Sequence, residues 1–181
     1  MNNLSMHILD IVQNSIRAEA SNIELLVHED IDNDRLIIKV SDNGKGMTPE
    51  QVKKLKDPFF TSRTTRRVGL GIPLLTQTAE QTGGSVVVTS ELGKGTITKA
   101  VFSYSNIDRP PMGPLGNSVT LLATANPEIN FTFIYKFKSL EYRFNNLQVS
   151  EILGEISINS PSIFKYINEM ISENINMLKT T

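Results

Sequence analysis

Leu36-Ile37-Ile38-Lys39-Val40-Ser41 runs directly into Asp42-Asn43-Gly44-Lys45-Gly46-Met47, and this junction decides the fold. The first six residues are short, apolar and largely β-branched, which predicts a buried strand. Gly44 and Gly46 permit backbone angles and close approaches that a side chain would forbid. Asp42 ends the strand, so a rigid element can aim its carboxylate at an exocyclic amine such as that of adenine. A plain turn is the alternative interpretation, because Asp-Asn-Gly is a common turn sequence.

The composition limits the kind of protein. The chain has 181 residues, a formal net charge of -1 and no cysteine. This length can bury a core in one or two domains, and the charge gives no bias toward nucleic acid or acidic membrane. The missing cysteines exclude disulfides and thiolate metal sites. The N-terminus does not resemble a signal peptide, and no apolar run approaches a membrane span. We therefore expect a cytoplasmic protein that binds neither nucleic acid nor membrane.

A helix is predicted over residues 4–20. Its apolar face recurs at helical spacing and comprises Leu4, Ile8, Ile11, Val12 and Ile16. The spacing also places His7, Asp10, Asn14 and Arg17 in one stripe, which either faces solvent or lines a site. As a site it has a specific chemistry. The Asn14 amide oxygen suits Mg²⁺, and the Asp10 carboxylate one turn earlier can orient or deprotonate a nucleophile.

The segments around the opening junction have clear local signals. Residues 22–28 and 36–41 are predicted to pair as a hairpin around a turn at residues 31–34. Thr48 and Pro49 are expected to start a short helix, because Thr can cap a helix and Pro fits its first turn.

Residues 57–68 are expected to form a loop. Phe59 and Phe60 stand at one end of it, and three arginines follow, the first being Arg63. A basic, hydroxyl-rich loop beside a glycine-rich turn is typical of a lid over polyphosphate. An ordinary charged surface loop and a nucleic-acid patch are the alternatives.

Gly69-Leu70-Gly71-Ile72-Pro73 is predicted to open a second long helix that runs to about Thr82. Pro73 is tolerated only near a helix start, so residues 69–72 lie at the N-terminus of this helix. Free backbone N–H groups and the positive end of the helix dipole then point at the loop before it. We interpret this segment as a phosphate cradle, although it is not a Walker A loop. Its expected core face consists of Leu70, Leu74, Leu75, Thr78 and Ala79.

Residues 85–91 and 96–104 are predicted to form a second hairpin around the turn at residues 92–95. The return strand places apolar residues at Ile97, Ala100 and Phe102. Its Thr96 and Thr98 could offer hydroxyls to a base or to a water bound there, or could simply favour the strand.

Taken together, these segments resemble the ATP-binding domain shared by gyrase-type topoisomerases, heat-shock ninety chaperones, sensor histidine kinases and mismatch-repair ATPases, the GHKL or Bergerat superfamily. The resemblance covers residues 4–104. It rests on five ordered motifs, the N, G1, F, G2 and Gly-Thr boxes, which match residues 10–18, 42–47, 57–60, 69–72 and 93–96. It implies a two-layer α+β sandwich with a mixed, mostly antiparallel sheet and helices on one face.

The resemblance also implies roles for particular residues. Mg²⁺ would lie on Asn14, adenine on Asp42 and the triphosphate beneath residues 59–71. Asp10 and Arg63 would be the catalytic residues. Asp10 stands where hydrolytic members usually carry glutamate, which leaves phosphotransfer or slow hydrolysis as the options. The ATP-contacting set would be Asn14, Arg17, Asp42, Gly44, Gly46, Met47, Phe60, Thr61, Arg63, Gly69, Leu70, Gly71, Ile72 and Thr96.

The favoured function is an Mg²⁺-dependent ATP-binding kinase that phosphorylates a separate protein. Sensor histidine kinases carry an acceptor histidine on a helical hairpin before this domain, whereas His7 and His28 lie on no such hairpin. The chain therefore looks more similar to stand-alone anti-sigma-factor-type kinases. A slow ATPase that acts as a conformational clamp and a nucleotide sensor without turnover are the alternatives.

The last third of the chain is predicted to be a separate unit. Residues 106–116 are rich in proline and glycine, which predicts a linker between an ATP-binding domain at 1–105 and a small α+β domain at 117–181. Strand and helix are expected at residues 131–137 and 161–178, the latter capped by Ser160. This unit could dock on the sheet, pair with a second copy in a homodimer, or receive a partner.

Overall fold

The computed structural model describes residues 2–55, 57 and 70–181. Its helices are α1 Leu4–Arg17, α2 Pro49–Lys54, α3 Gly71–Gln81, α4 Leu115–Ala125, α5 Asn146–Leu153 and α6 Pro161–Thr180, with a short 3-10 helix, η1, at Ile31–Asn33. Its strands are β1 Asn22–Asp30, β2 Arg35–Asp42, β3 Ser85–Glu91, β4 Gly95–Ser103, β5 Asn130–Phe137 and β6 Leu140–Asn145. None of the described helices is both long and apolar enough to cross a membrane.

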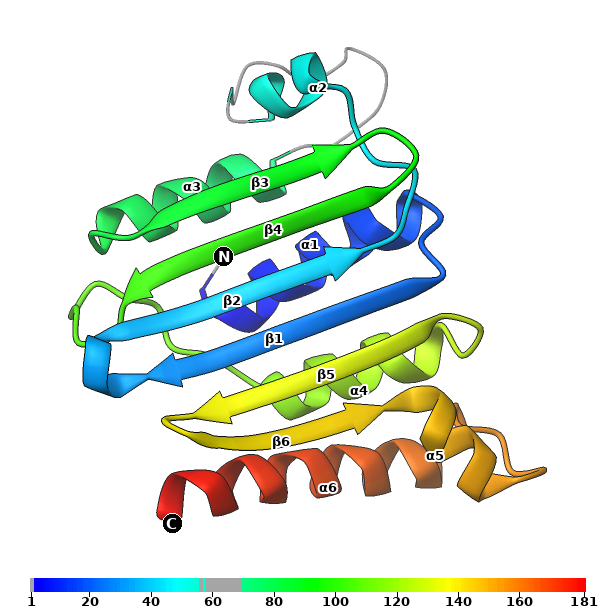
Figure 1. The fold of residues 1–181 in the computed structure, drawn as a ribbon. Helices are drawn as coiled ribbons and strands as arrows, with labels where there is room; N and C mark the ends of the chain where they lie inside the picture. Colours follow the sequence, from blue (N-terminus) through cyan, green and yellow to red (C-terminus); the bar gives the residue numbers. More distant parts are fainter. Residues whose placement is uncertain (1, 56, 58–69) are drawn as a thin grey trace.

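The strands form one six-stranded sheet in the order β3-β4-β2-β1-β5-β6. The pair β1–β5 is parallel, and every other neighbouring pair is antiparallel. Helices α1, α3 and α4 lie behind the sheet in the view of Figure 1. This mixed, mostly antiparallel sheet with helices on one face confirms the predicted α+β fold class.

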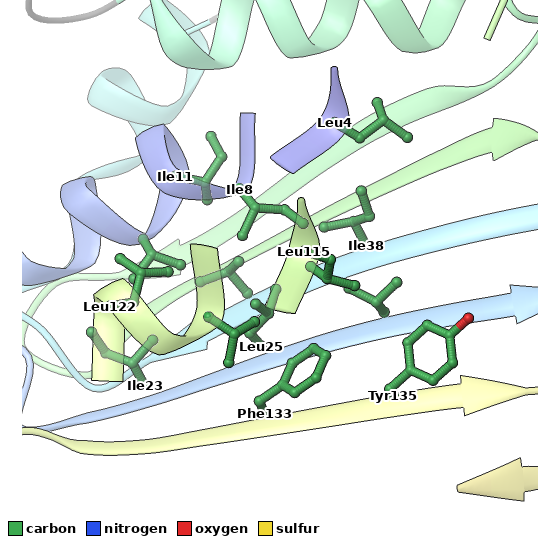
Figure 2. Close-up of a cluster of buried hydrophobic side chains, with 14 of the residues drawn as sticks. Leu4, Ile8, Ile11, Ile23, Leu25, Ile38, Leu115, Leu122, Phe133 and Tyr135 are labelled. Carbon is green, nitrogen blue, oxygen red and sulfur yellow. The ribbon is translucent and has the colours of Figure 1, made fainter. Parts of the chain in front are cut away.

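The core lies between the sheet and the helices behind it. Strand β1 alternates, with Ile23, Leu25 and Val27 almost fully buried on the helix side. The opposite side of the core comes from the apolar stripe of α1, including Leu4 and Ile8, as Figure 2 shows. Alternation of period two in strands and spacing of three to four in the helix explain why these residues meet.

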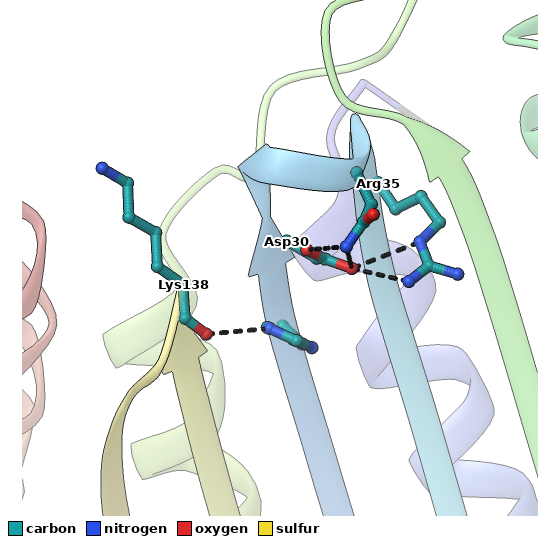
Figure 3. A network of polar contacts seen from close by, with 5 residues as sticks. Asp30, Arg35 and Lys138 are labelled. Atoms are coloured by element: carbon teal, nitrogen blue, oxygen red, sulfur yellow. Dashed lines mark hydrogen bonds and ion pairs between the residues drawn. The ribbon is translucent and has the colours of Figure 1, made fainter.

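The hairpin of β1 and β2 closes on η1 as predicted. At this end Asp30 accepts hydrogen bonds from the Arg35 guanidinium, at 2.7 Å, and from the Asn33 amide, at 2.9 Å (Figure 3). The side chain of His28 also lies here, 3.2 Å from the carbonyl oxygen of Lys138. The polar groups at this turn therefore bond to one another.

Two predicted apolar faces are wrong in part. In β4, Thr98 is buried and Ile97 is 44% exposed, because pairing with Val40 puts Thr98 on the helix side and alternation puts Ile97 on the other. In α3, the buried stripe is Ile72, Leu75 and Ala79, whereas Leu70 and Leu74 are exposed. Leu75 and Ala79 are therefore buried as predicted, but the core face of α3 extends toward Ile72 instead of toward Leu70 and Leu74.

The C-terminal segment continues the sheet. Strand β5 pairs with β1 over its whole length, and α4 packs against both α1 and α6. Docking on the sheet was one of three alternatives for residues 117–181, and it is the one observed. The division into two domains stays a prediction. The side-chain cap expected at Ser160 is wrong, because its hydroxyl is buried and finds no hydrogen-bond partner among the described residues.

Helix α5 was not predicted from the sequence. Asn145 caps it by accepting a hydrogen bond from the Gln148 N–H at 3.1 Å.

Candidate nucleotide site

A cavity of about 290 Å³ opens between α1, the end of β2 and the start of α3. Strands β3 and β4 close its far side through Val88, Thr96 and Thr98. The remaining lining residues come from α1, from the β2 end with the loop after it, and from the two helices that follow, and they are Ile11, Asn14, Ser15, Arg17, Ala18, Asp42, Lys45, Gly46, Met47, Leu55 and Ile72.

Asp42 is the last residue of β2, and its carboxylate is held at both oxygens. The Ser15 hydroxyl donates to Oδ2 at 2.5 Å, and the Gly44 N–H donates to Oδ1 at 2.9 Å. In the part of the chain that the structure describes, Asp42 forms no ion pair. A carboxylate oxygen can accept more than one hydrogen bond, so this fixed anion can still accept one from a ligand amine.

The glycines allow the loop after Asp42 to pass between other elements. A Cβ on Gly44 would lie 2.7 Å from the Ala18 carbonyl oxygen. Gly46 has a φ of +68°, and a Cβ there would lie 2.0 Å from the carbonyl oxygen of Glu91. The loop is held by the Lys45 N–H, which donates to the Ala18 carbonyl at 2.9 Å. Close backbone approach therefore requires glycine at both positions.

The polar stripe of α1 is divided by the fold. Asn14 and Arg17 are exposed and line the cavity, and Arg17 Nη1 lies 3.4 Å from Asn14 Oδ1. Asp10 lies one turn back, beside the first residue of α3, because a Cβ on Gly71 would be 3.7 Å from Asp10 Oδ2. Burial raises the pKa of the Asp10 carboxyl, and the nearby Arg17 partly opposes that rise.

His7 belongs to the same stripe but is only 2% exposed. Its Nε2 lies 3.4 Å from the Thr78 hydroxyl of α3, and its Nδ1 has no hydrogen-bond partner among the described residues. Burial lowers the pKa of His7 to about 4. The polar stripe of α1 therefore has two environments: α3 covers His7, whereas Asn14 and Arg17 line the cavity.

The side-chain oxygen of Asn14 fits a magnesium ion that is shared with a bound ligand. Within the described ranges, no group of three or more His, Asp or Glu side chains could hold a metal by itself. Asn14 offers one neutral oxygen at the cavity, and Mg²⁺ is commonly bound through one or two protein oxygens, several waters and the phosphates of a substrate.

Comparison with known proteins identifies the family. The model of the family described as "Histidine kinase-, DNA gyrase B-, and HSP90-like ATPase" matches residues 2–106. The chain belongs to this family. Among curated relatives, sporulation kinase E of Bacillus subtilis (strain 168) is 34% identical over 98 residues, which are 53% of this chain and 13% of that kinase. Sensor histidine kinase ZraS of Salmonella typhimurium is 41% identical over 64 residues, which are 35% of this chain and 14% of that protein.

Solved structures share the fold over more of the chain. The ATPase domain of Aquifex aeolicus MutL complexed with ADP has a TM-score of 0.53 and 17% identity over 84% of this chain and 69% of that one. An N-terminal domain of a DNA repair protein has a TM-score of 0.60 and 18% identity over 87% and 59%. This likeness extends past the residues that the family model matches, so it includes part of the C-terminal segment.

Within this ATPase fold, the structure brings together seven of the residues expected to contact ATP. These line the cavity and are Asn14, Arg17, Asp42, Gly46, Met47, Ile72 and Thr96. Asp10, Gly44, Leu70 and Gly71 do not line it, although the Gly44 N–H donates to Asp42 and Gly71 lies beside Asp10. Phe60, Thr61, Arg63 and Gly69, with the expected lid, lie outside the described residues. All of these roles stay predictions.

Sequence reasoning missed Ser15 and Lys45, which also line the cavity. Ser15 follows Asn14 and occupies the apolar face of α1, four residues after Ile11. A small polar residue on a buried helix face needs a hydrogen-bond partner, and that requirement is the signal that could have led to its contact with Asp42.

Proposed function

We propose that the chain binds Mg²⁺-ATP in the 290 Å³ cavity and transfers the γ-phosphoryl group to a separate protein. The observation that carries the proposal is the Asp42 carboxylate, which is fixed by Ser15 and Gly44 and faces a cavity whose lining surface is mainly apolar. A fixed hydrogen-bond acceptor in an apolar pocket suits an aminopurine ring. Membership of the ATPase family and the kinases among its relatives support this choice of ligand and reaction.

The phosphates would extend toward the start of α3. The first-turn N–H groups of this helix have no intrahelical acceptor and carry the positive end of the dipole. Asn14 would hold the Mg²⁺, which neutralises charge on the phosphates during transfer.

Asp10 would accept the proton of the acceptor group. The acceptor then forms its bond to the γ-phosphorus as the bond between that phosphorus and the ADP oxygen breaks. Burial raises the pKa of the Asp10 carboxyl, which makes it a stronger base than an ordinary aspartate.

The first test is titration calorimetry of ATP and ADP with and without Mg²⁺. We expect both nucleotides to bind and ATP to bind more tightly with Mg²⁺. Phosphate release and transfer to candidate acceptor proteins are then measured on the same samples. A wild-type chain that binds neither nucleotide would contradict both the proposed site and the proposed reaction.

Asp10→Ala separates the chemical role from binding. We expect it to abolish phosphoryl transfer and leave ATP affinity within about twofold, since Asp10 lies beside the cavity rather than in its lining. Asp32→Ala is the matched control, because Asp32 is exposed on η1, at the other end of the β1–β2 hairpin from Asp42. If Asp10→Ala loses ATP binding instead, the residue is structural. Binding with neither release nor transfer would favour a nucleotide sensor.

A conformational clamp is the second candidate, and a chain of asparagines favours it. Asn43, in the loop after Asp42, accepts hydrogen bonds from the N–H groups of Ser21 and Asn22 at 2.9 Å each. The Asn130 amide donates to Asn22 Oδ1 at 2.9 Å, and the Asn145 amide donates to Asn130 Oδ1 at 2.7 Å. Asn145 caps α5. The cavity loop is thus connected to the C-terminal segment.

Hydrogen exchange tests the clamp. ATP should slow amide exchange in α5 of the wild type, and Asn130→Ala should remove that effect while ATP still binds. Asn33→Ala, at the other end of the hairpin, is the control. If ATP does not change amide exchange in α5, the clamp is contradicted, and the kinase is the remaining candidate that turns over ATP.

A further inference from the structure

The side of the sheet opposite α1, α3 and α4 carries exposed side chains. In Figure 1 this side faces the viewer, and none of the described helices lies over its centre. Strand register places Leu26 beside Lys39, Lys39 beside Lys99, and Lys99 beside Val87 in one row. In the next row Ile37 lies beside Val101. We call these six residues the open face.

The six residues of the open face include two lysines and no acid. Lys39 and Lys99 are directly opposed on β2 and β4, and like charges in that position are unfavourable. Neither lysine forms an ion pair with a described acid, Glu24 on the same side of β1 included. By contrast, Lys136 lies 3.2 Å from Glu141. The other cross-strand neighbours of the two lysines are aliphatic, Leu26 beside Lys39 and Val87 beside Lys99, and Val87 is 56% exposed.

The end of α5 and the turn after it have the opposite character. This segment lies at one corner of the molecule, beyond the end of β6 (Figure 1). Ile152 is 85% exposed and Ile156 is 57% exposed, which is far more than such residues show in a core. Glu151 and Glu155 are exposed beside them and form no ion pair among the described residues. We call these four residues the α5 corner.

We propose that the α5 corner of one copy of the chain docks on the open face of a second copy. Two exposed carboxylates would meet the ammonium groups of the half-buried Lys39 and the exposed Lys99. Ile152 with Ile156 would cover the aliphatic residues of the open face. The two patches differ, so a single contact of this kind is heterologous and repeats into a ring or an open chain. A closed dimer forms instead if the α5 corner of each copy docks on the open face of the other. This association goes beyond the proposed function and requires no nucleotide.

Charge reversal on each patch provides a direct test. Sedimentation velocity of the wild type, from about 10 µM to about 1 mM in low salt, should show a mass that rises with concentration and falls with added salt. Lys39→Glu/Lys99→Glu should weaken association at least about tenfold. Glu151→Lys/Glu155→Lys should do the same. An equal mixture of these two variants should associate again, because each patch then meets its opposite charge on the other variant.

Single substitutions test the apolar part. Ile152→Ser should weaken association about tenfold. Ile107→Ser is the matched control, since Ile107 is 96% exposed on neither patch. All of these positions are on the surface, and thermal unfolding checks that each variant folds. A wild type that stays monomeric throughout, or a mixture that associates no better than either variant alone, would overturn the proposal.

Discussion

The hairpin of β1 and β2 ends in a carboxylate at each extremity, and the two have different surroundings. Asp42 closes β2 and is held by two neutral donors, the Ser15 hydroxyl and the Gly44 N–H. Asp30 closes β1 and is paired with the Arg35 guanidinium at 2.7 Å, with Asn33 on its other side (Figure 3). Only Asp42 borders a cavity of about 290 Å³.

This difference separates a binding group from a structural one. The Arg35 and Asn33 hydrogen bonds hold the pKa of Asp30 below its usual value, so that carboxylate is already stabilised by its own neighbours. Neutral partners orient Asp42 without cancelling its charge. A strand-end aspartate is therefore a strong candidate for ligand recognition where its partners are neutral and an apolar cavity adjoins it.

The largest expected effect comes from replacing the aspartate at each end of the β1–β2 hairpin with asparagine, one at a time. Asp42→Asn should weaken ATP binding at least about 100-fold, or about 2.7 kcal/mol, because it removes a charged acceptor and places an amide donor near the donors Ser15 and Gly44. Asp30→Asn should leave ATP affinity unchanged. Calorimetry on both variants measures this, and equal losses would abolish the distinction drawn between the two ends.

The next effect concerns acid stability, which must be known before the two aspartates can be compared at low pH. The pKa of His7 is about 4 in the fold and about 6.5 when unfolded. Below pH 6.5 the unfolded chain takes up the proton first, so stability falls as pH falls toward 4. We expect a loss of about 2 kcal/mol between pH 7 and pH 5 by urea unfolding.

His7→Gln should remove this loss, whereas His28→Gln, which changes the other histidine, should retain it. A wild-type stability that does not change over this range would show that His7 titrates normally.

A smaller effect is expected for the group that orients Asp42. Ser15→Ala removes one neutral hydrogen bond, worth about 1 kcal/mol, and should weaken ATP binding about fivefold. Ser5→Ala is its control on the same helix, since the Ser5 hydroxyl donates to the Met112 carbonyl at 2.6 Å and lies away from the cavity. If both variants bind like the wild type, Asp42 does not need Ser15 for its orientation.

The smallest effect is that of Asp30 on stability. Because its pKa is lowered in the fold, its contribution is present above the unfolded pKa of about 3.8 and is lost as pH falls through the folded value. Asp30→Asn should therefore lower the unfolding temperature slightly at pH 7 and leave it unchanged near pH 2. A penalty that persists at pH 2 would mean that packing, rather than charge, is responsible.

Local sequence patterns determined most of the elements of this protein. The β-branched run before Asp42 predicted a strand, and the glycines at 44 and 46 predicted a loop that approaches other backbone closely. The spacing of apolar residues predicted α1, and strand and turn patterns predicted the hairpin of β3 and β4. These predictions succeed because periodicity and turn chemistry act between residues close in the chain.

Only the tertiary structure decided which elements cover one another. The local sequence shows that Ser15 needs a hydrogen-bond partner, but it does not show that the partner is Asp42. Nor does it indicate that α3 buries His7 or that β5 pairs with β1. The contact between Ser15 and Asp42 joins residues 27 apart, and that between Asn22 and Asn130 joins residues 108 apart. A sequence pattern shows which face of an element is apolar, but which partner buries that face depends on the packing of the whole chain.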